Sequence, residues 1–156
     1  MRIALVISSL RTGGAERSAV NLCKGLLRAG HKVAVLTWSS AETDFFHLPD
    51  GAQRIALDMF RPSQSAIEAL GANLRRLSAL RAALRDFAPD AVISFMTATN
   101  VQTVLALAGS GVPVVITDHH NPGHEMLGRA WKLLRRAVYP RAARLVLELA
   151  KGTALD

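Results

Sequence analysis

The sequence predicts an α/β fold with a doubly wound, mostly parallel, Rossmann-like sheet. Short apolar runs rich in β-branched residues alternate along the chain with segments whose apolar residues recur at helical spacing. Such apolar runs are typical of parallel strands that helices cover on both faces. The 156 residues suffice for one domain with a substantial core and are too few for two ordinary domains. We therefore expect 1–156 to form one domain with right-handed crossovers.

Each element follows from a local signal. Ile3–Ile7 predicts the central first strand, Gly30 lies where a helix is expected to end, and Pro89 ends a long amphipathic pattern. In chain order the expected elements are a strand at Ile3–Ile7, a helix from Ala15 to Gly30, strands at Val33–Leu36 and Arg54–Leu57, a helix at Ile67–Leu84, a strand at Ala91–Phe95, a helix at Val101–Ala108, a strand at Val112–Thr117, a basic helix at 127–138 and a strand at Leu145–Leu149.

Composition and charge limit the classes of partner that the chain is expected to bind. Half of the residues are hydrophobic and 20% are charged, which is typical of a globular chain and excludes a disordered one. The net charge of +7 favours anionic partners: phosphates, nucleotides, acidic membrane surfaces or nucleic acid. Only 5% of the residues are aromatic, so a nucleic-acid partner is not expected. Cys23, the only cysteine, interrupts no apolar pattern and predicts a small buried hydrophobe.

The amino terminus predicts a strand rather than a signal peptide. Its apolar run breaks at Ser8–Ser9 without a small-residue cleavage site. Nothing in the sequence reaches the roughly 18 apolar residues that a membrane-spanning helix needs. We therefore expect a cytoplasmic protein.

A double glycine, Gly13–Gly14, joins the first strand to the first helix in the stretch SSLRTGGAER. Two interpretations fit it equally. The glycines either permit a tight connection, or they let a phosphate approach the backbone N–H groups and the positive end of the helix dipole. The sequence lacks G-x-G-x-x-G, an acidic residue directly after the second strand, and G-x-x-x-x-G-K-[ST], so nicotinamide and P-loop chemistry are disfavoured.

The combination of motifs resembles family 4 glycosyltransferases. GGAER after the first strand and AGHKV before the second resemble the N-terminal half of these retaining enzymes, which have the two-domain GT-B architecture. The segments ISFMTATN and VPVVITDHHNPG are similar to the fourth and fifth strands of the same half. The resemblance spans nearly the whole chain. It implies a nucleotide-sugar donor, a glycan or lipid-linked acceptor, and no metal or other cofactor.

The resemblance places the donor diphosphate beside Gly13 and Gly14, with Glu16 and Arg17 on the same side. Both charged residues have an ordinary alternative. A carboxylate such as Glu16 is favoured in the first turn of any helix, and we weigh this capping role above a ligand contact. Arg17 reaches either a phosphate or solvent.

The histidines after the fifth strand are the other candidates. By alignment of T-x-H the resemblance implies that His119 is the catalytic residue close to the transferred sugar, where an imidazole can bond a hydroxyl or support charge at the anomeric carbon. His120 and Asn121 are expected substrate contacts, the alternative being a polar loop. Thr97 and Asn100 follow the fourth strand and are predicted substrate contacts, in even balance with ordinary helix capping. We expect no metal site.

The basic segment 127–138 predicts an amphipathic helix. It either lies on an anionic membrane, which would place the protein peripherally at the inner face, or packs on the domain with its basic side in solvent. GT-B enzymes react in a cleft between two domains, and the expected C-terminal donor domain is absent from this chain. We therefore expect the chain to fold without catalysing transfer alone, with the second domain supplied by another chain. The alternative is a non-catalytic α/β binding or interaction module.

Overall fold

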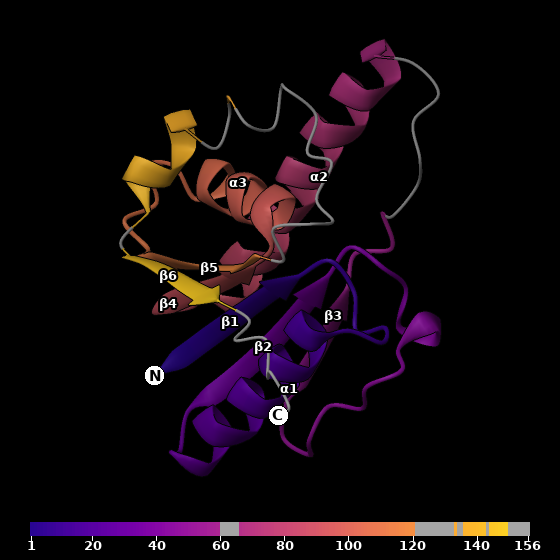
Figure 1. The fold of residues 1–156 in the computed structure, drawn as a ribbon, viewed down its shortest axis with the longest axis vertical. Helices are drawn as coiled ribbons and strands as arrows, with labels where there is room; N and C mark the ends of the chain where they lie inside the picture. The colour runs from indigo at the N-terminus through magenta and orange to yellow at the C-terminus, as the bar shows by residue number, and fades with distance from the viewer. Residues whose placement is uncertain (60–65, 121–132, 134–135, 143, 150–156) are drawn as a thin grey trace, which may run out of the picture.

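The computed structural model describes residues 1–59, 66–120, 133, 136–142 and 144–149. Within them, six parallel strands form one sheet in the order β3-β2-β1-β4-β5-β6 (Figure 1). This order is that of a doubly wound sheet made of two β-α-β-α-β halves, so the predicted fold class and the central position of the first strand are confirmed. The strands are β1 Arg2–Ile7, β2 Lys32–Thr37, β3 Gln53–Ala56, β4 Ala91–Phe95, β5 Val114–His120 and β6 Arg144–Leu149.

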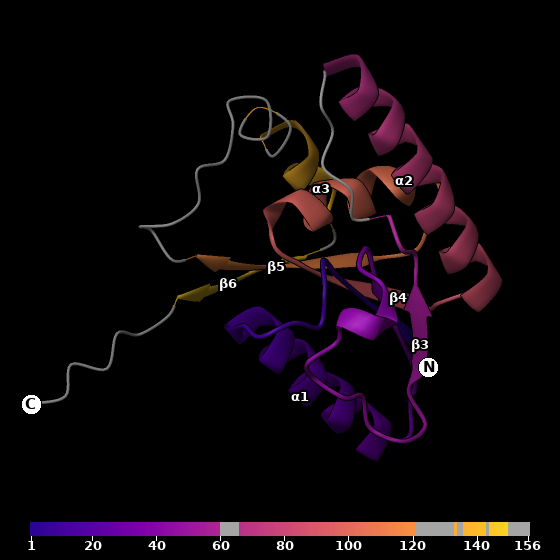
Figure 2. The ribbon, with the colours of Figure 1, turned by 90° about the vertical axis from the view of Figure 1, so that its right-hand side faces the viewer.

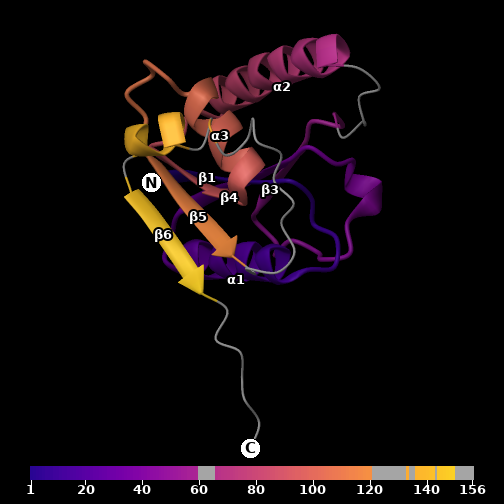
Figure 3. The same ribbon diagram turned by 45° about the horizontal axis from the view of Figure 1, so that its top comes forward.

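Helices cover the sheet on both faces. α1 (Gly14–Arg28) lies on one face, and α2 (Ala66–Phe87) and α3 (Thr97–Ala106) lie on the other (Figures 2 and 3). Because side chains alternate along a strand, β1 contributes side chains to the hydrophobic cluster on each face of the sheet. Leu5 packs in the cluster under α1, whereas Val6 packs in the cluster under α2 and α3. Both side chains are fully buried, as the apolar run of β1 predicts.

α1 begins and ends where the glycines predict. Gly13 is its N-cap, and Gly30 follows its C-cap with φ +79°, a conformation that glycine adopts without strain. The Gly30 N–H donates to the Leu27 carbonyl and the His31 N–H donates to the Leu26 carbonyl, which is a Schellman ending. On the inner face of the helix, Cys23 is buried, as the sequence predicts, and burial raises the pKa of its thiol.

Several predicted boundaries differ from the structure, and for two of them the structure shows the cause. α3 begins at Thr97, four residues before the predicted start at Val101, because its polar first turn is buried against the protein and tertiary contacts override low helix propensity. β5 ends at His120 and not at Thr117. The reason is its neighbour: β6 pairs with β5 as far as His120 opposite Leu149, which extends the ladder beyond the apolar run.

No helix in the part of the chain that the structure describes has the length and apolar character to cross a membrane. The basic segment 127–138 lies outside the described residues except for 133 and 136–138. Among these four, Leu133 is exposed and Val138 is buried against the α2 and α3 face of the sheet.

Candidate functional site

The candidate site lies at the carboxyl edge of the sheet, at the switch point between β1 and β4. Strands β2 and β3 are added on one side of this point, and β5 and β6 are added on the other. Open α/β sheets bind ligands in the crevice at this point. The loop that follows β1 runs from Ser8 to the glycine turn, Gly13–Gly14, and the segment that follows β4 starts at Met96. The two meet directly, since the Ser8 hydroxyl lies 3.7 Å from the Met96 sulfur. β5 adjoins them, because the Met96 N–H donates to the Thr117 carbonyl at 3.2 Å.

The glycine turn presents unpaired backbone donors. The first helical hydrogen bond of α1 runs from the Arg17 N–H to the Gly13 carbonyl at 3.1 Å. The N–H groups of Gly13, Gly14, Ala15 and Glu16 donate to no other described residue, and no side chain caps the helix. Gly13 and Gly14 are exposed. This end of α1 therefore combines open N–H groups with the positive end of the helix dipole.

The two glycines differ in the space around them. A Cβ added at Gly14 would meet nothing within 4 Å, so the turn is open there. A Cβ added at Gly13 would clash with a carboxylate oxygen of Glu16, which is folded back over the turn. The same carboxylate accepts a hydrogen bond from the Ser9 hydroxyl at 3.4 Å. The structure thus leaves one side of the turn open and sets the protein's own carboxylate on the other.

Charge near the turn is mixed. Arg11 and Arg17 are exposed on either side of the glycines, and neither guanidinium group forms a hydrogen bond or ion pair with another described residue. Both cations are available to an anion at the turn, whereas the Glu16 carboxylate opposes one.

The loop before the glycines is held by the segment that follows β2. The Ser8 carbonyl accepts hydrogen bonds from the Trp38 and Ser39 N–H groups at 3.2 and 3.1 Å. The Leu10 carbonyl accepts from the Phe45 and Phe46 N–H groups, both at 2.9 Å. Leu10 itself is fully buried in the cluster under α1. The approach to the turn is therefore fixed at two carbonyl groups.

Met96 is a feature that the sequence does not signal. Its backbone has φ 72° and ψ 141°, in a positive-φ region that favours glycine, and it is the N-cap of α3. Holding a residue in such a conformation destabilises the folded state by about 1–3 kcal/mol, and residues of this kind cluster at functional sites. Nothing in the residue type indicates this strain, because methionine at the end of an apolar strand is ordinary core composition.

The structure places Thr97 and Asn100 inside the protein. Both side chains are fully buried. The Asn100 amide nitrogen donates to the Thr117 carbonyl at 2.9 Å and to the Tyr139 hydroxyl at 3.2 Å, and its oxygen accepts from the Ser94 hydroxyl at 2.6 Å. Asn100 thus ties α3 to β4 and β5 and to the short helix η2 (Tyr139–Arg141). Its predicted substrate contact stays a prediction, and the capping alternative does not apply because Met96 is the N-cap.

His119 and His120 are the last two residues of β5, opposite Glu148 and Leu149 of β6. The sequence predicts them in a loop beyond the strand, so their backbone position differs from that expectation. They remain at the carboxyl edge of the sheet, two and three residues after Thr117. Asn121 lies outside the described residues. Among the residues that the structure describes, no three His, Cys, Asp or Glu side chains gather in a metal-binding group.

Comparisons with known proteins agree with this architecture. The model of the family described as Glycosyltransferase Family 4 matches residues 12–147. The chain is 31% identical over 140 residues to the Campylobacter jejuni protein named GalNAc-alpha-(1->4)-GalNAc-alpha-(1->3)-diNAcBac-PP-undecaprenol alpha-1,4-N-acetyl-D-galactosaminyltransferase. The match covers 90% of this chain and 38% of that protein.

Solved structures are similar in fold. MurG from Acinetobacter baumannii has a TM-score of 0.66 at 16% identity, covering 99% of this chain and 43% of that one. Sucrose-phosphate synthase from Thermosynechococcus elongatus has a TM-score of 0.72 at 12% identity, covering 93% and 42%. The chain therefore spans about two fifths of the length of these proteins, and at these identities the likeness is one of fold alone.

Proposed function

Because the chain belongs to glycosyltransferase family 4, we propose that it is the N-terminal, acceptor-side half of a GT-B enzyme that transfers a sugar from a nucleotide-sugar donor. The acceptor would be a glycan or a lipid-linked glycan, as the name of the C. jejuni relative indicates for that protein. The single observation that carries the proposal is the glycine turn: unpaired N–H groups at the start of α1, with open space at Gly14, on the carboxyl edge of the sheet.

In this proposal the donor diphosphate lies against Gly13 and Gly14. The N–H groups at the start of α1 stabilise the negative charge that grows on the leaving diphosphate, and Arg17 lies within the same helical turn. His119 would act beside the transferred sugar, where its imidazole bonds a hydroxyl or supports positive charge at the anomeric carbon. No metal ion is required, because the helix N-terminus and Arg17 supply the positive charge.

The remaining parts belong to the complete enzyme. A second, donor-binding domain would form the other wall of the cleft, in the same polypeptide or in a partner chain, and without it the present chain should not catalyse transfer. Contact of the basic segment 127–138 with the inner face of a membrane would bring a lipid-linked acceptor to the site. A cytoplasmic location would supply the nucleotide sugar.

Substituting valine for Gly14 tests whether the glycine turn binds a diphosphate. The added side chain would enter the open space at the turn, so we expect Gly14→Val to weaken pyrophosphate and nucleoside-diphosphate binding at least about tenfold, or ~1.4 kcal/mol. Gly25→Val is the matched control, because Gly25 lies on the same helix with equally open surroundings. Isothermal titration calorimetry on wild type and both variants measures these affinities. Equal affinities of Gly14→Val and wild type would remove the glycine turn from donor binding.

One observation favours the alternative of a non-catalytic binding module: the Glu16 carboxylate lies over Gly13, where it opposes an anion. If the turn binds a diphosphate, Glu16→Gln removes this opposing charge and should tighten pyrophosphate binding by a factor of about 3–10, the size of one Coulomb interaction near a protein surface. The same titration measures it. Should neither wild type nor Glu16→Gln bind any diphosphate, the module interpretation would replace the transferase one.

A further inference from the structure

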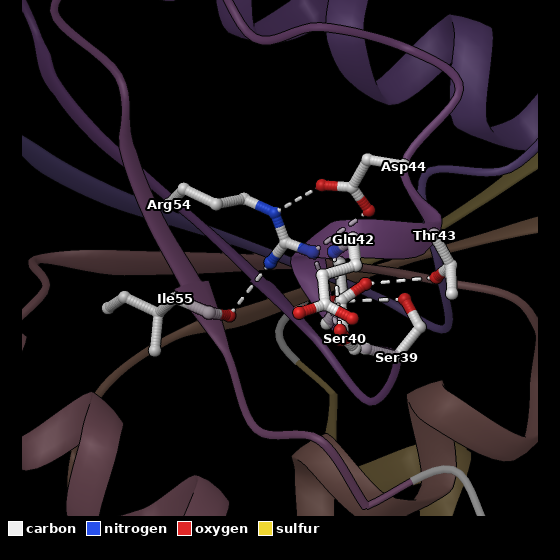
Figure 4. Close-up of polar contacts among 8 residues, drawn as sticks. Ser39, Ser40, Glu42, Thr43, Asp44, Arg54 and Ile55 are labelled. Atoms are coloured by element: carbon white, nitrogen blue, oxygen red, sulfur yellow. Dashed lines mark hydrogen bonds and ion pairs between the residues drawn. The ribbon is translucent and has the colours of Figure 1, made fainter.

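We propose that Arg54 is a positioning residue for the glycine turn, and that it acts from the edge strand β3 along two routes of hydrogen bonds and adjoining backbone. The proposal rests on the proposed function in one respect, since the turn is taken to be the diphosphate site. Arg54 does not touch that site itself. From β3 its side chain reaches Thr37 at the end of β2 and Asp44 after the second strand, and it also bonds its neighbour Ile55 (Figure 4 shows Asp44 and Ile55).

The guanidinium group of Arg54 is almost fully engaged. It binds Asp44 with two hydrogen bonds, from Nε to Oδ2 at 2.7 Å and from Nη2 to Oδ1 at 3.1 Å. Nη2 also donates to the Thr37 hydroxyl at 2.7 Å, and Nη1 donates to the Ile55 carbonyl at 3.0 Å. The side chains of Arg54 and Asp44 are only 19% and 15% exposed, so water screens this pair less than it screens an ordinary surface ion pair. Forked, two-point geometry of this kind fixes direction as well as distance.

The first chain of contacts leads through Asp44. Asp44 directly follows the short helix η1 (Ala41–Thr43), and its N–H donates to the Ala41 carbonyl. The next two residues, Phe45 and Phe46, both donate their N–H groups to the Leu10 carbonyl at 2.9 Å. Leu10 lies three residues before Gly13. Holding Asp44 therefore holds the donors that fix the loop at Leu10.

The second chain of contacts leads through Thr37. The Thr37 hydroxyl accepts from Arg54 and donates to the Ser39 carbonyl at 2.8 Å. The Ser39 N–H donates in turn to the Ser8 carbonyl at 3.1 Å. Arg54 is thus connected to both carbonyl groups, at Ser8 and at Leu10, that anchor the loop leading to the glycine turn. A lysine could not replace it, because a single ammonium lacks the planar fork that serves Asp44, Thr37 and Ile55 together.

Arg54→Met tests the proposal by two measurements on the folded protein. We expect hydrogen exchange of the Phe45 and Phe46 N–H groups to accelerate at least about tenfold, because their segment loses its attachment. We also expect the Gly13 and Gly14 N–H resonances to shift, and pyrophosphate affinity in an NMR titration to fall about tenfold. Arg54→Lys should recover only part of both losses. Combining Arg54→Met with Asp44→Asn should add little to the exchange rates of either single variant.

Arg2→Met is the matched control. Arg2 is a similarly half-buried arginine that donates from Nε to the Phe87 carbonyl and lies over the Phe87 ring, at the opposite, amino-terminal end of the sheet. Arg2→Met removes the contacts of the Arg2 guanidinium group with Phe87 and should leave the Phe45, Phe46 and glycine N–H groups unchanged. If Arg2→Met and Arg54→Met change these groups equally, Arg54 contributes only general stability and the proposal is wrong.

The two measurements separate this proposal from the proposed function. If wild type binds no pyrophosphate, the proposed diphosphate site is wrong. The amide exchange rates of Phe45 and Phe46 then decide by themselves whether Arg54 positions the loop that leads to the turn. If wild type binds and Arg54→Met binds equally well with unchanged exchange, the positioning role falls and the diphosphate site stands. If Arg54→Met does not fold, Asp44→Asn, which removes the charge of Asp44 while keeping the side-chain shape, replaces it in the same comparison.

Discussion

Replacing Leu5 with alanine is expected to lower the free energy of unfolding by about 3–5 kcal/mol. Leu5 lies on the central strand β1 and is fully buried in the cluster under α1. It pairs in register with Val35 of β2 on one side and Ile93 of β4 on the other, so a cavity at this position opens between the centre of the sheet and α1. The packed strands on either side limit relaxation, which places the cost toward the upper part of the range. A domain of this size has about 5–15 kcal/mol in total, so the loss would be a large fraction.

The control for Leu5→Ala is the same substitution on the surface. Leu74 on α2 is 60% exposed, and we expect Leu74→Ala to change the free energy of unfolding by no more than about 0.5 kcal/mol. Urea denaturation followed by circular dichroism measures both variants against wild type. Equal losses at Leu5 and Leu74 would mean that α1 does not cover β1 as described.

The fold was predictable where local chemistry decides the structure. The apolar run of β1 and the glycines at both ends of α1 mark their elements directly, because burial on two faces and helix ends each require particular residue types. The end of β5 was not predictable from its own residues. Asp118, His119 and His120 extend the strand because β6 supplies partners, and such partners belong to a segment more than twenty residues further along the chain.

The candidate site was predictable only in part, for a related reason. Gly13 and Gly14 are identifiable because a missing Cβ is a property of the residue itself. The strain at Met96 and the contact of Arg54 with Asp44 depend on tertiary structure, and no residue type signals them. Asn100 shows the opposite case. Its polarity after the fourth strand predicts either a ligand contact or helix capping, whereas in the structure its side chain binds partners within the protein.

Aspartate at Asn100 is expected to destabilise the protein by about 3–5 kcal/mol near pH 7, the usual cost of an uncompensated buried charge. The substitution replaces an N–H donor with a second acceptor, which then faces the Thr117 carbonyl oxygen at the position where the amide now donates at 2.9 Å. Asn21→Asp is the control, because Asn21 is exposed on α1 and the same change there should cost no more than about 0.5 kcal/mol.

The pH dependence of Asn100→Asp distinguishes a structural from a ligand-contacting Asn100. Burial raises the pKa of the new carboxyl above its unfolded value of about 3.9, and the protonated form can again donate to Thr117. Between these two pKa values the folded state keeps a proton that the unfolded state has lost. The free energy of unfolding of Asn100→Asp, relative to wild type, is therefore best preserved below about pH 4 and declines as pH rises through the folded pKa. Urea denaturation at pH 4 to 8, each variant against wild type at the same pH, measures this difference. A small penalty that does not vary with pH would mean that position 100 is solvated, and its predicted role as a substrate contact would then be favoured over the structural one.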